Sequence, residues 1–278
     1  MKGWKYYNRA MIPTTAPNEP VDTSCIEDKS IWKENKRAIL ARWTSDFDCG
    51  YETEWWYIVK DAPFDLSVLK SKRRYEIKKG CKNFEVKVIK PSDYREALYE
   101  VQFAAFSAYP RKYRPVLDKE RFSNGLARWN RYVTLGAFDK DNILRGYALL
   151  EKTSDLWFEF IVLRTTPACE KLGINAALVE KVLDYCKDFL QSGGILCDGS
   201  RSINHETNFQ DYLEKYFGFR RAFCRLHIAY NPKYAWLVKA LYPWRRSLSY
   251  LNGLGVIHQI SALLKMEEIS RRQKKEAC

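Results

Sequence analysis

Two carboxylates stand where they could accept a proton during a reaction. Glu159 is the only charged residue in the apolar run 156–163, and Asp198 lies near the end of the next apolar run, 194–199. An ionised side chain on a buried strand must face an open cleft or be paired, so Glu159 is either a general base or half of a structural pair. Asp198 is the reserve base, because open α/β sheets bind ligands at the carboxyl ends of their strands. Capping of the following turn is its alternative role.

A polar turn between these two runs could bind a phosphate group. It contains Pro167, Lys171 and Gly173, and a helix is predicted to start directly after it. The first N–H groups of a helix have no internal partner, and the helix dipole favours anions there. Lys171, Gly173 and the amides of 174–176 would therefore form a nest of phosphate size. The simpler explanation of Gly173 is that it eases a tight turn.

The elements that carry these residues indicate an α/β core. Residues 156–163 read as a buried strand, and 194–199 read as a second one. Between them, apolar residues recur at spacings of four, four, three and four, which places one apolar stripe on one face of a helix. The stripe consists of Ile174, Leu178, Val182, Tyr185 and Phe189.

The rest of the chain alternates between short strands and helices. Residues 1–35 are polar and contain several prolines, so they are predicted to be extended or loop structure. The helix over 66–79 is rich in Lys and Arg and is predicted to end at Gly80, in the C′ position. The other predicted elements are strands 38–44, 54–59 and 84–88, helices 94–108 and 119–129, hairpin strands 132–139 and 143–151 around DKDN, a short helix from 208, a turn at 218 and strand 222–230.

The segment 156–190 resembles the coenzyme-binding part of the GNAT N-acyltransferases, where a strand leads into R/Q-x-x-G-x-G/A and then a helix. The central glycine of that motif falls on Gly173, whereas Glu170 and Asn175 stand at its first and last positions. The turn at Gly218 and the elements around it are also similar to the family. The resemblance implies a GNAT-like fold with a mixed α+β sheet, and acetyl-CoA or another acyl-CoA as co-substrate, without a metal. It assigns coenzyme binding to Val162, Leu163, Arg164, Lys171, Leu172, Gly173, Ile174, Asn175 and Ala176.

The same resemblance suggests catalytic roles. A strand carboxylate beside the thioester is a recurrent base in the family, which favours Glu159 and then Asp198. The family's general acid, a tyrosine four residues before the late-turn glycine, falls on Glu214, which Tyr212 and Tyr216 flank. We select Tyr212. The loop residue His205 is the histidine best placed to reach such a site.

Residues 38–90 are similar to the junction between the two halves of FemAB-type transferases. A strand ending in WWYIVKD is followed by a short loop, a basic helix and another strand. FemAB enzymes pair two GNAT-like halves and build peptidoglycan cross-bridges from aminoacyl-tRNA. The resemblance implies a partial FemAB-like extension over 1–82, a catalytic domain over 83–232 and an amphipathic helical tail over 233–278.

An aromatic and basic surface could hold the acceptor of such a reaction. Its residues come from the strands at 38–44 and 54–59 and from the basic helix, and a nucleotide-linked sugar or an anionic glycan would suit them. Ordinary strand packing explains the aromatic residues equally well. The candidate acceptor-binding residues are Arg42, Trp43, Trp56, Tyr57, Arg73 and Arg74, with Trp55 beside them.

The composition favours an anionic partner. Lys and Arg number 47 against 34 Asp and Glu, a net charge of +13, which suits a nucleotide cofactor, tRNA, a phospholipid surface or an acidic glycan. The eight cysteines include no C-x-x-C pair, which fits reduced thiols in a cytoplasmic protein and no metal site. No apolar run approaches the roughly 20 residues of a membrane helix, and the N-terminus lacks the apolar core of a secretory signal. The amphipathic tail would allow docking to the inner face of the membrane, and packing against the core is its alternative role.

We therefore predict a GNAT-like enzyme that moves an acyl group, in the first place acetyl, from acyl-CoA to an amine on a sugar or cell-envelope precursor. The acceptor class comes from analogy. A FemAB-type aminoacyltransferase that uses aminoacyl-tRNA is one alternative. A catalytically silent binding module on the same fold is another, supported by Glu170, Asn175 and Glu214 at motif positions.

Overall fold

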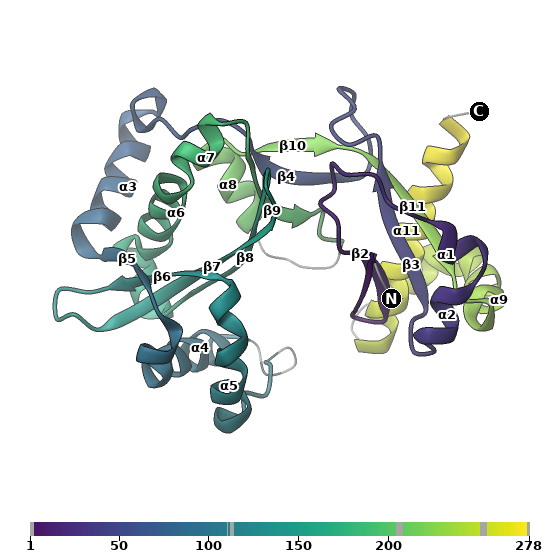
Figure 1. The fold of residues 1–278 in the computed structure, drawn as a ribbon, viewed down its shortest axis with the longest axis horizontal. Coiled ribbons are helices and arrows are strands. Elements are labelled where there is room, and N and C mark those ends of the chain that lie inside the picture. The colour runs from purple at the N-terminus through teal and green to yellow at the C-terminus, as the bar shows by residue number, and fades with distance from the viewer. Residues whose placement is uncertain (1–2, 110, 112–113, 204–207, 251–254, 277–278) are drawn as a thin grey trace. The chain divides into compact units, whose positions relative to one another are not determined.

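The described part of the chain folds into helices around two mixed β-sheets, one of seven strands and one of four (Figure 1). The structure is a computed structural model, and it describes residues 3–109, 111, 114–203, 208–250 and 255–276. Both sheets combine parallel and antiparallel neighbours. The predicted fold class, a mixed α+β arrangement, is confirmed.

The chain divides into two compact units. The first unit consists of 1–58, 200–208 and 221–278, and the second consists of 59–199 and 209–220. The segment 1–82, expected as an extension, contributes to both units, and the tail 233–278 belongs to the first. The domain boundaries at 82 and 232 stay predictions.

The seven-stranded sheet has the order β10-β4-β9-β8-β7-β6-β5. Strands β5 to β8 are antiparallel neighbours, and β8 runs parallel to β9. The predicted hairpin around DKDN is confirmed as β6 and β7, and in its turn Asp139 Oδ1 accepts hydrogen bonds from the N–H groups of Asp141 and Ile143. The strands are β4 (Trp56–Lys60), β5 (Glu85–Ile89), β6 (Val133–Phe138), β7 (Leu144–Ser154), β8 (Trp157–Thr165), β9 (Ile195–Ser200) and β10 (Arg220–Phe223).

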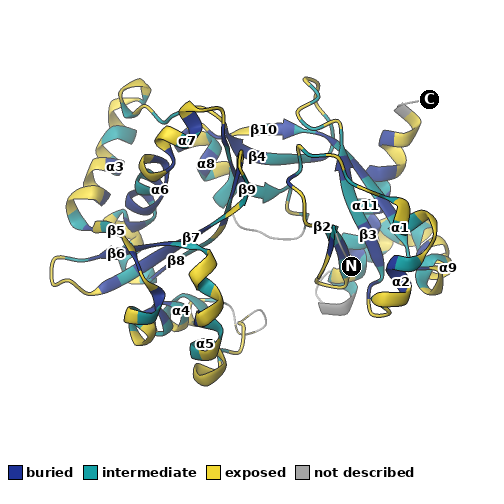
Figure 2. Cartoon of the chain, in the orientation of Figure 1, coloured by how far each residue is buried: buried dark blue, intermediate teal, exposed yellow. Residues whose placement is uncertain are grey.

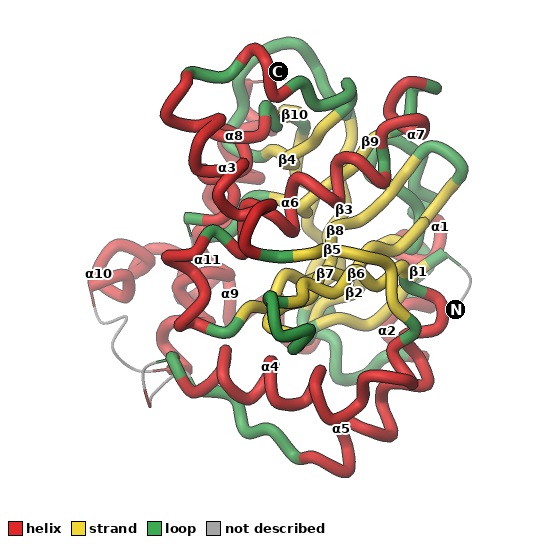
Figure 3. Tube along the Cα trace, turned by 90° about the vertical axis from the view of Figure 1, so that its left-hand side faces the viewer, coloured by secondary structure: helices red, strands yellow, loops and turns green. Residues whose placement is uncertain are grey.

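Helices cover both faces of the antiparallel part of this sheet (Figures 1 and 3). On one face, Leu98 and Val101 of α4 pack against Tyr147 and Leu149 of β7. Helix α6 covers the other face. The described helical segments of the second unit are η1 (Leu66–Val68), α3 (Ser71–Asn83), η2 (Pro91–Tyr94), α4 (Arg95–Ser107), α5 (Lys119–Gly125), η4 (Leu126–Arg131), η5 (Pro167–Leu172), α6 (Ile174–Tyr185), α7 (Lys187–Gln191) and α8 (Phe209–Phe217).

The apolar stripe predicted for α6 is right at its start and wrong at its end. Its residues from Ile174 to Val182 at helical spacing are fully buried, but Tyr185 is exposed. The α-helix stops at Tyr185 and resumes at Lys187 as α7. The buried positions that continue the stripe after Val182 are instead Cys186 and Leu190, each four residues further along.

The first unit contains the four-stranded sheet, of order β1-β2-β3-β11. Helix α11 packs along β11, where the side chain of the buried Gln273 accepts a hydrogen bond from the N–H of Leu226. No helix in the described ranges is long and apolar enough to cross a membrane. The elements are β1 (Trp4–Tyr7), β2 (Ala10–Pro13), α1 (Ser24–Glu27), α2 (Ser30–Glu34), β3 (Leu40–Ser45), β11 (Arg225–Tyr230), α9 (Pro232–Leu241), η6 (Tyr242–Trp244), α10 (Arg245–Tyr250) and α11 (Gly255–Glu276).

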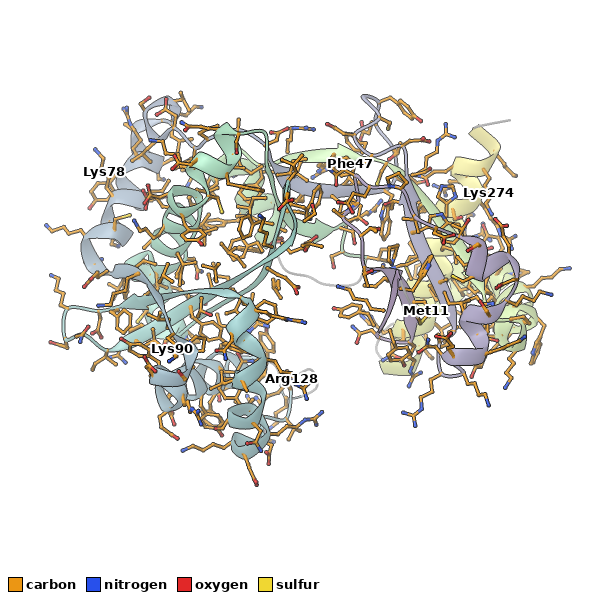
Figure 4. All side chains as sticks on the ribbon, in the orientation of Figure 1. Met11, Phe47, Lys78, Lys90, Arg128 and Lys274 are labelled. Carbon is orange, nitrogen blue, oxygen red and sulfur yellow. The ribbon has the colours of Figure 1, made fainter. Side chains whose placement is uncertain are left out.

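The prediction of extended or loop structure over 1–35 is right for the strands β1 and β2 and wrong for the short helices α1 and α2. Residues 4–13 form an antiparallel hairpin, and β2 extends the sheet by pairing with β3. The apolar residues that hold this segment are widely spaced: Trp4, Met11 and Ile31 are each at most 5 % exposed and share one cluster. Met11 lies among the side chains of this unit in Figure 4. This packing cannot be predicted from the local sequence pattern, because the elements are short and prolines interrupt them.

The predicted end of the basic helix at Gly80 is also wrong. Gly80 lies inside α3, which continues to Asn83. A Cβ atom on Gly80 would lie 2.3 Å from the carbonyl oxygen of Gly173, so glycine is needed here for close contact between two backbones. Gly173 itself has φ +89°, a conformation that favours glycine, and a Cβ atom on it would lie 2.9 Å from the Cα of Gly80.

We expect Gly80→Ala to destabilise the protein by about 1–3 kcal/mol, because the added methyl group must push two backbone segments apart. Gly125→Ala is the matched control: Gly125 ends α5 in open space at negative φ, so alanine there should be neutral or stabilise by up to about 1 kcal/mol. Urea denaturation of the two variants measures the difference. Equal stabilities would contradict the close approach of α3 to the turn before α6.

Candidate active site

Strands β8 and β9 pair over a short distance and then separate. Their parallel register joins Trp157 to Ile195, Phe158 to Leu196 and Glu159 to Cys197. Beyond these pairs, β8 continues to Thr165 along β7, and no further residue pair joins β8 to β9 within the described residues. The two predicted bases lie at this point of separation, since Asp198 follows directly after the partner of Glu159.

The structure brings Glu159 and Asp198 into electrostatic contact. Glu159 Oε1 accepts a hydrogen bond from the indole Nε1 of the buried Trp157 at 2.7 Å. Burial, and then the negative charge of Glu159, raise the pKa of Asp198 to about 8, while a hydrogen bond with Gln210 acts in the opposite direction. The Asp198 carboxyl therefore holds a proton at neutral pH and can release it near pH 8. A group that titrates close to the working pH is suited to general acid–base chemistry.

Helix α8 places aromatic side chains against the separated part of β8. Phe209 meets Phe160 edge to face at 5.8 Å and stacks beside Tyr212 at 6.1 Å. The same helix supplies Gln210 to Asp198. The sequence analysis missed Gln210, because nothing in its spacing marks it and only the fold brings it to β9.

Tyr212 borders a small pocket between α3, α6 and α8. The pocket has a volume of about 20 Å³, enough for roughly one water molecule. Burial, and then the charge of Glu76, raise the pKa of Tyr212, so its hydroxyl keeps its proton and can donate it. The lining residues are Arg73, Glu76, Ile77, Ala176, Tyr212, Tyr216 and Phe217.

Arg73 belongs to this pocket. Its guanidinium lies 3.9 Å from the ring centre of Tyr216 and forms a 2.7 Å ion pair with Glu76. The structure places it with Tyr212 and with Ala176 of the predicted coenzyme turn, and its role as an acceptor residue stays a prediction. Arg74 lies apart from it and donates to the carbonyl oxygen of Ser67.

The turn before α6 is held from outside by α3. Lys79 Nζ donates to the carbonyl oxygen of Lys171 at 2.9 Å, and Asn83 Nδ2 donates to that of Leu172 at 3.0 Å. The side chain of Asn175, at the last motif position, accepts a hydrogen bond from Thr165 Oγ1 at 2.9 Å. The turn is thus anchored to α3 and to β8, and Lys79 adds a positive charge near the exposed Glu170. Phosphate binding by the amides of 174–176 stays a prediction.

The other predicted coenzyme residues lie on β8. Val162, Leu163 and Arg164 pair with β7 through one edge of the strand and are all partly exposed. Arg164 donates to the carbonyl oxygen of Leu163, while its Nε is buried without a hydrogen-bond partner. A buried donor without a partner is uncommon in proteins, so Arg164 is the residue of this group best suited to contact a ligand.

The aromatic members of the predicted acceptor surface take part in packing in the first unit. Trp43 stacks on His227 with ring centres 5.3 Å apart. The ring of Trp56 lies under the guanidinium groups of Arg201 and Arg221, at 4.5 and 4.6 Å. The ring of Tyr57 lies 6.1 Å from that of Phe47. These contacts agree with the packing explanation, and acceptor binding by these residues stays a prediction.

Arg42 differs from its neighbours on this surface. Its guanidinium lies 5.8 Å from the ring centre of Trp55 and 3.6 Å from Met266 Sδ, and burial lowers its pKa. Among the described residues it has no carboxylate partner, and the buried Nε1 of Trp55 has no acceptor. Because its partly buried guanidinium lacks a carboxylate partner among the described residues and lies beside the unsatisfied Nε1 of Trp55, Arg42 is the candidate of this surface that best suits an anion.

His205 lies outside the described residues. Within the described ranges, no group of three or more His, Cys, Asp or Glu side chains could hold a metal ion.

Comparison with known proteins shows the class of fold. No protein-family model matches the sequence, and no curated protein matches it. Among solved structures, similarity extends over most of the chain, and the fold is GNAT-like and similar to that of FemX. The predicted resemblance is therefore confirmed at the level of fold.

Three solved structures illustrate this similarity. The crystal structure of FemX superposes with TM-score 0.53 at 9 % identity, over 83 % of this chain and 84 % of that chain. The C-terminal domain assigned to a lysylphosphatidylglycerol synthetase from Agrobacterium fabrum gives 0.51 at 11 %, over 85 % and 82 %. A conserved protein of unknown function from Bacteroides thetaiotaomicron gives 0.51 at 10 %, over 80 % and 78 %. At these identities the similarity concerns the fold alone.

The raised pKa of the half-buried Asp198 predicts how stability depends on pH. Its pKa is about 8 in the folded protein against an ordinary 3.8, so folding favours the protonated form. The resulting loss of stability is absent below about pH 4 and grows as pH rises toward 8. Asp198→Asn removes it and should become increasingly more stable than the wild type across that range. Urea denaturation at several pH values tests this, with the fully exposed Asp155→Asn as control. A difference that does not change with pH would contradict the buried acid.

Removing the Arg42 charge should raise stability in a buffer without phosphate, since a buried cation lacking a carboxylate costs free energy. We expect Arg42→Met to melt at a higher temperature than the wild type and to lose the stabilisation that added phosphate gives by mass action. Arg37→Met, at an exposed position with the same change of net charge, should keep the response to phosphate. Thermal denaturation with and without phosphate measures both effects. A less stable Arg42→Met that still responds to phosphate would contradict the anion contact.

Proposed function

We propose that the chain is a transferase that moves an acyl or aminoacyl group onto an amine. The observation that carries this proposal is the Asp198 carboxyl, whose pKa burial and the Glu159 charge raise to about 8, at the point where β8 and β9 separate. In the reaction the amine nitrogen attacks the carbonyl carbon of the donor. The new C–N bond replaces a C–O bond of an ester or a C–S bond of a thioester.

Two protons move in this reaction, and the second unit offers a group for each. The attacking amine loses a proton to the Asp198 carboxylate, which is available in increasing amounts as pH approaches 8. Glu159, beside it, is the second acceptor. Tyr212, whose pKa burial raises, supplies a proton to the leaving oxygen or sulfur. The rate should therefore increase with pH up to about 8.

Among donors, aminoacyl-tRNA is favoured over acyl-CoA. The similarity in fold to FemX covers most of both chains and not a single GNAT half, and the net charge of +13 suits a large polyanion. Beside Ala176, at the predicted coenzyme turn, the pocket holds only about 20 Å³. Two of three motif positions carry other residues, and one of these, Asn175, is engaged with Thr165.

Acyl-CoA is the second candidate donor, and specific features support it. The second unit contains the point where β8 and β9 separate and the first turn of α6, which has no side-chain cap. It also contains the Nε of Arg164, which is buried without a hydrogen-bond partner among the described residues. The acceptor in either case is proposed as an amine on a sugar or cell-envelope precursor, as the resemblance to FemAB enzymes implies. The silent binding module remains the outcome if no donor is consumed.

The donor test compares aminoacyl-tRNA and acetyl-CoA with small amines as surrogate acceptors. We expect the purified protein to form an amide from aminoacyl-tRNA, with binding that weakens as salt is added. Amide formation from acetyl-CoA instead would select the second donor. RNA binding without amide formation would leave a binding module and overturn the transferase.

The base can be tested with two amines of different pKa. An alkylamine with a pKa near 10.4 needs about 4–5 kcal/mol to become neutral at pH 7, whereas a weakly basic amine such as hydroxylamine needs little. Asp198→Asn should therefore slow transfer to the alkylamine by about 10²- to 10⁴-fold and transfer to hydroxylamine far less. Asp155→Asn should leave both rates unchanged. An equal loss with both amines would show that Asp198 does not act as the base.

A further inference from the structure

The segment between Glu214 and Glu267 contains no acidic residue. Within it, α9, η6 and α10 follow one another along the chain over 232–250. The cations of this stretch are Lys233, Lys239, Arg245 and Arg246. A run of this length with only positive charges favours an anionic surface as its partner.

Helices α9 and α10 are joined through η6 with little change of backbone. At the junctions, Tyr242 has φ −57° and ψ −39°, and Arg245 has φ −54° and ψ −37°, both right-handed helical values. Positions four residues apart therefore lie close to one face along much of the stretch. One face is turned inward and the other outward.

The inward face is fixed to α11. Val238 is 4 % exposed. Arg245 bonds to Glu268 at 3.3 Å, and its guanidinium lies 4.3 Å from the ring centre of Tyr242. Arg271 of α11 lies 3.9 Å from the same ring. These contacts with α11 fix the orientation of the helical stretch within its own unit, and they therefore determine which of its residues face solvent.

The outward face carries large aromatic side chains in contact with solvent. Trp236 is 67 % exposed, Trp244 is 65 % exposed and Tyr250 is 89 % exposed, with Leu237 beside Trp236 at 40 %. Much of the surface of α9 is exposed in Figure 2. Trp236 and Trp244 are eight residues apart, two steps of four, with Ala240 between them. A cluster of exposed aromatics on one element marks an interaction site more often than a solvated surface.

We propose that the outward face of α9, η6 and α10 docks on a membrane surface that contains anionic lipid. Tryptophan and tyrosine place their rings at the level of the lipid head groups, where one end of the ring is apolar and the other wet. Lysine and arginine are attracted by the negative surface potential. The exposed Lys233, Lys239 and Arg246 lie on the same stretch as the aromatics, and the absence of acidic residues removes repulsion. The proposal does not depend on the transferase.

A lipid surface suits this face better than a protein partner. A protein interface combines an apolar centre with mixed charges at its rim, whereas this stretch offers cations alone. Interfacial helices show the same combination of aromatic residues and Lys or Arg. A second copy of the chain would bring the same positive charges together, which repel each other.

The test is binding of the full chain to vesicles, measured by cosedimentation. Vesicles of phosphatidylcholine with phosphatidylglycerol are compared with vesicles of phosphatidylcholine alone. We expect binding to the anionic vesicles, weaker binding at higher salt and little binding to the neutral ones. Tryptophan fluorescence of the bound protein should shift to shorter wavelength as the exposed indoles leave water.

Two double variants separate the aromatic and the cationic contributions. Trp236→Ser with Trp244→Ser should weaken binding about tenfold or more, and Lys233→Gln with Lys239→Gln should do the same. The control for charge is Lys72→Gln with Lys78→Gln on α3, where Figure 4 shows Lys78 at the surface, and the control for exposed apolar area is Val116→Ser. All four affect exposed residues, so their melting temperatures should match the wild type.

Several results would overturn the proposal. Absence of binding to anionic vesicles would do so, as would equal weakening by the α3 variant, which would show nonspecific attraction to a basic protein. Self-association that is lost in the tryptophan variant, without lipid binding, would assign the face to a second copy of the chain.

Discussion

The backbone of α3 touches the backbone of the turn before α6, and the positions of the groups around the proposed site in the second unit depend on this contact. Two glycines permit it, since a Cβ atom on Gly80 would lie 2.3 Å from the carbonyl oxygen of Gly173. At this distance Lys79 and Asn83 reach the carbonyl oxygens of the turn. Further along α3, Arg73 reaches Tyr216 of α8. One close approach thus sets both the anchoring of the predicted phosphate nest and the walls of the small pocket beside Tyr212.

A second constraint is the placement of a half-buried acid, Asp198, where two parallel strands separate. An isolated carboxylate with little access to water is costly, and the protein lowers this cost by keeping Asp198 protonated rather than by pairing it with a cation. Glu159 is stabilised differently, through the indole N–H of Trp157. Two carboxyl groups in different environments are a recurrent arrangement in acid–base catalysis. The raised pKa of Asp198 lowers the stability of the folded protein as pH rises toward 8, and it gives the protein a group that can exchange a proton near neutral pH.

In the first unit, residues of the same type differ in their surroundings: some pack inside the unit and others face solvent or lack an internal partner. Trp43 and Trp56 are covered by other side chains, whereas Trp236 and Trp244 are open to solvent. Arginines divide in the same way: Arg245 and Arg271 bond to glutamates of α11, whereas Arg42 is held among apolar and aromatic groups without a carboxylate within the described ranges. The residues that lack an internal explanation are the ones to which we assign contacts with partners.

The sequence by itself determined the features that depend on neighbours along the chain. The buried strand around Glu159, the start of the stripe on α6 and the hairpin around DKDN follow from local periodicity and turn chemistry. The resemblance of the segments around Gly173 and Gly218 to the GNAT family then implied a GNAT-like fold. Only the tertiary structure decided the role of Gly80, because a glycine that ends a helix and a glycine that permits close contact look the same in sequence. It also brought Arg73 to Tyr212, Gln210 to Asp198 and the first strands into a sheet. These outcomes depend on contacts between distant segments and on the burial that packing creates, and the pKa of Asp198 depends on that burial.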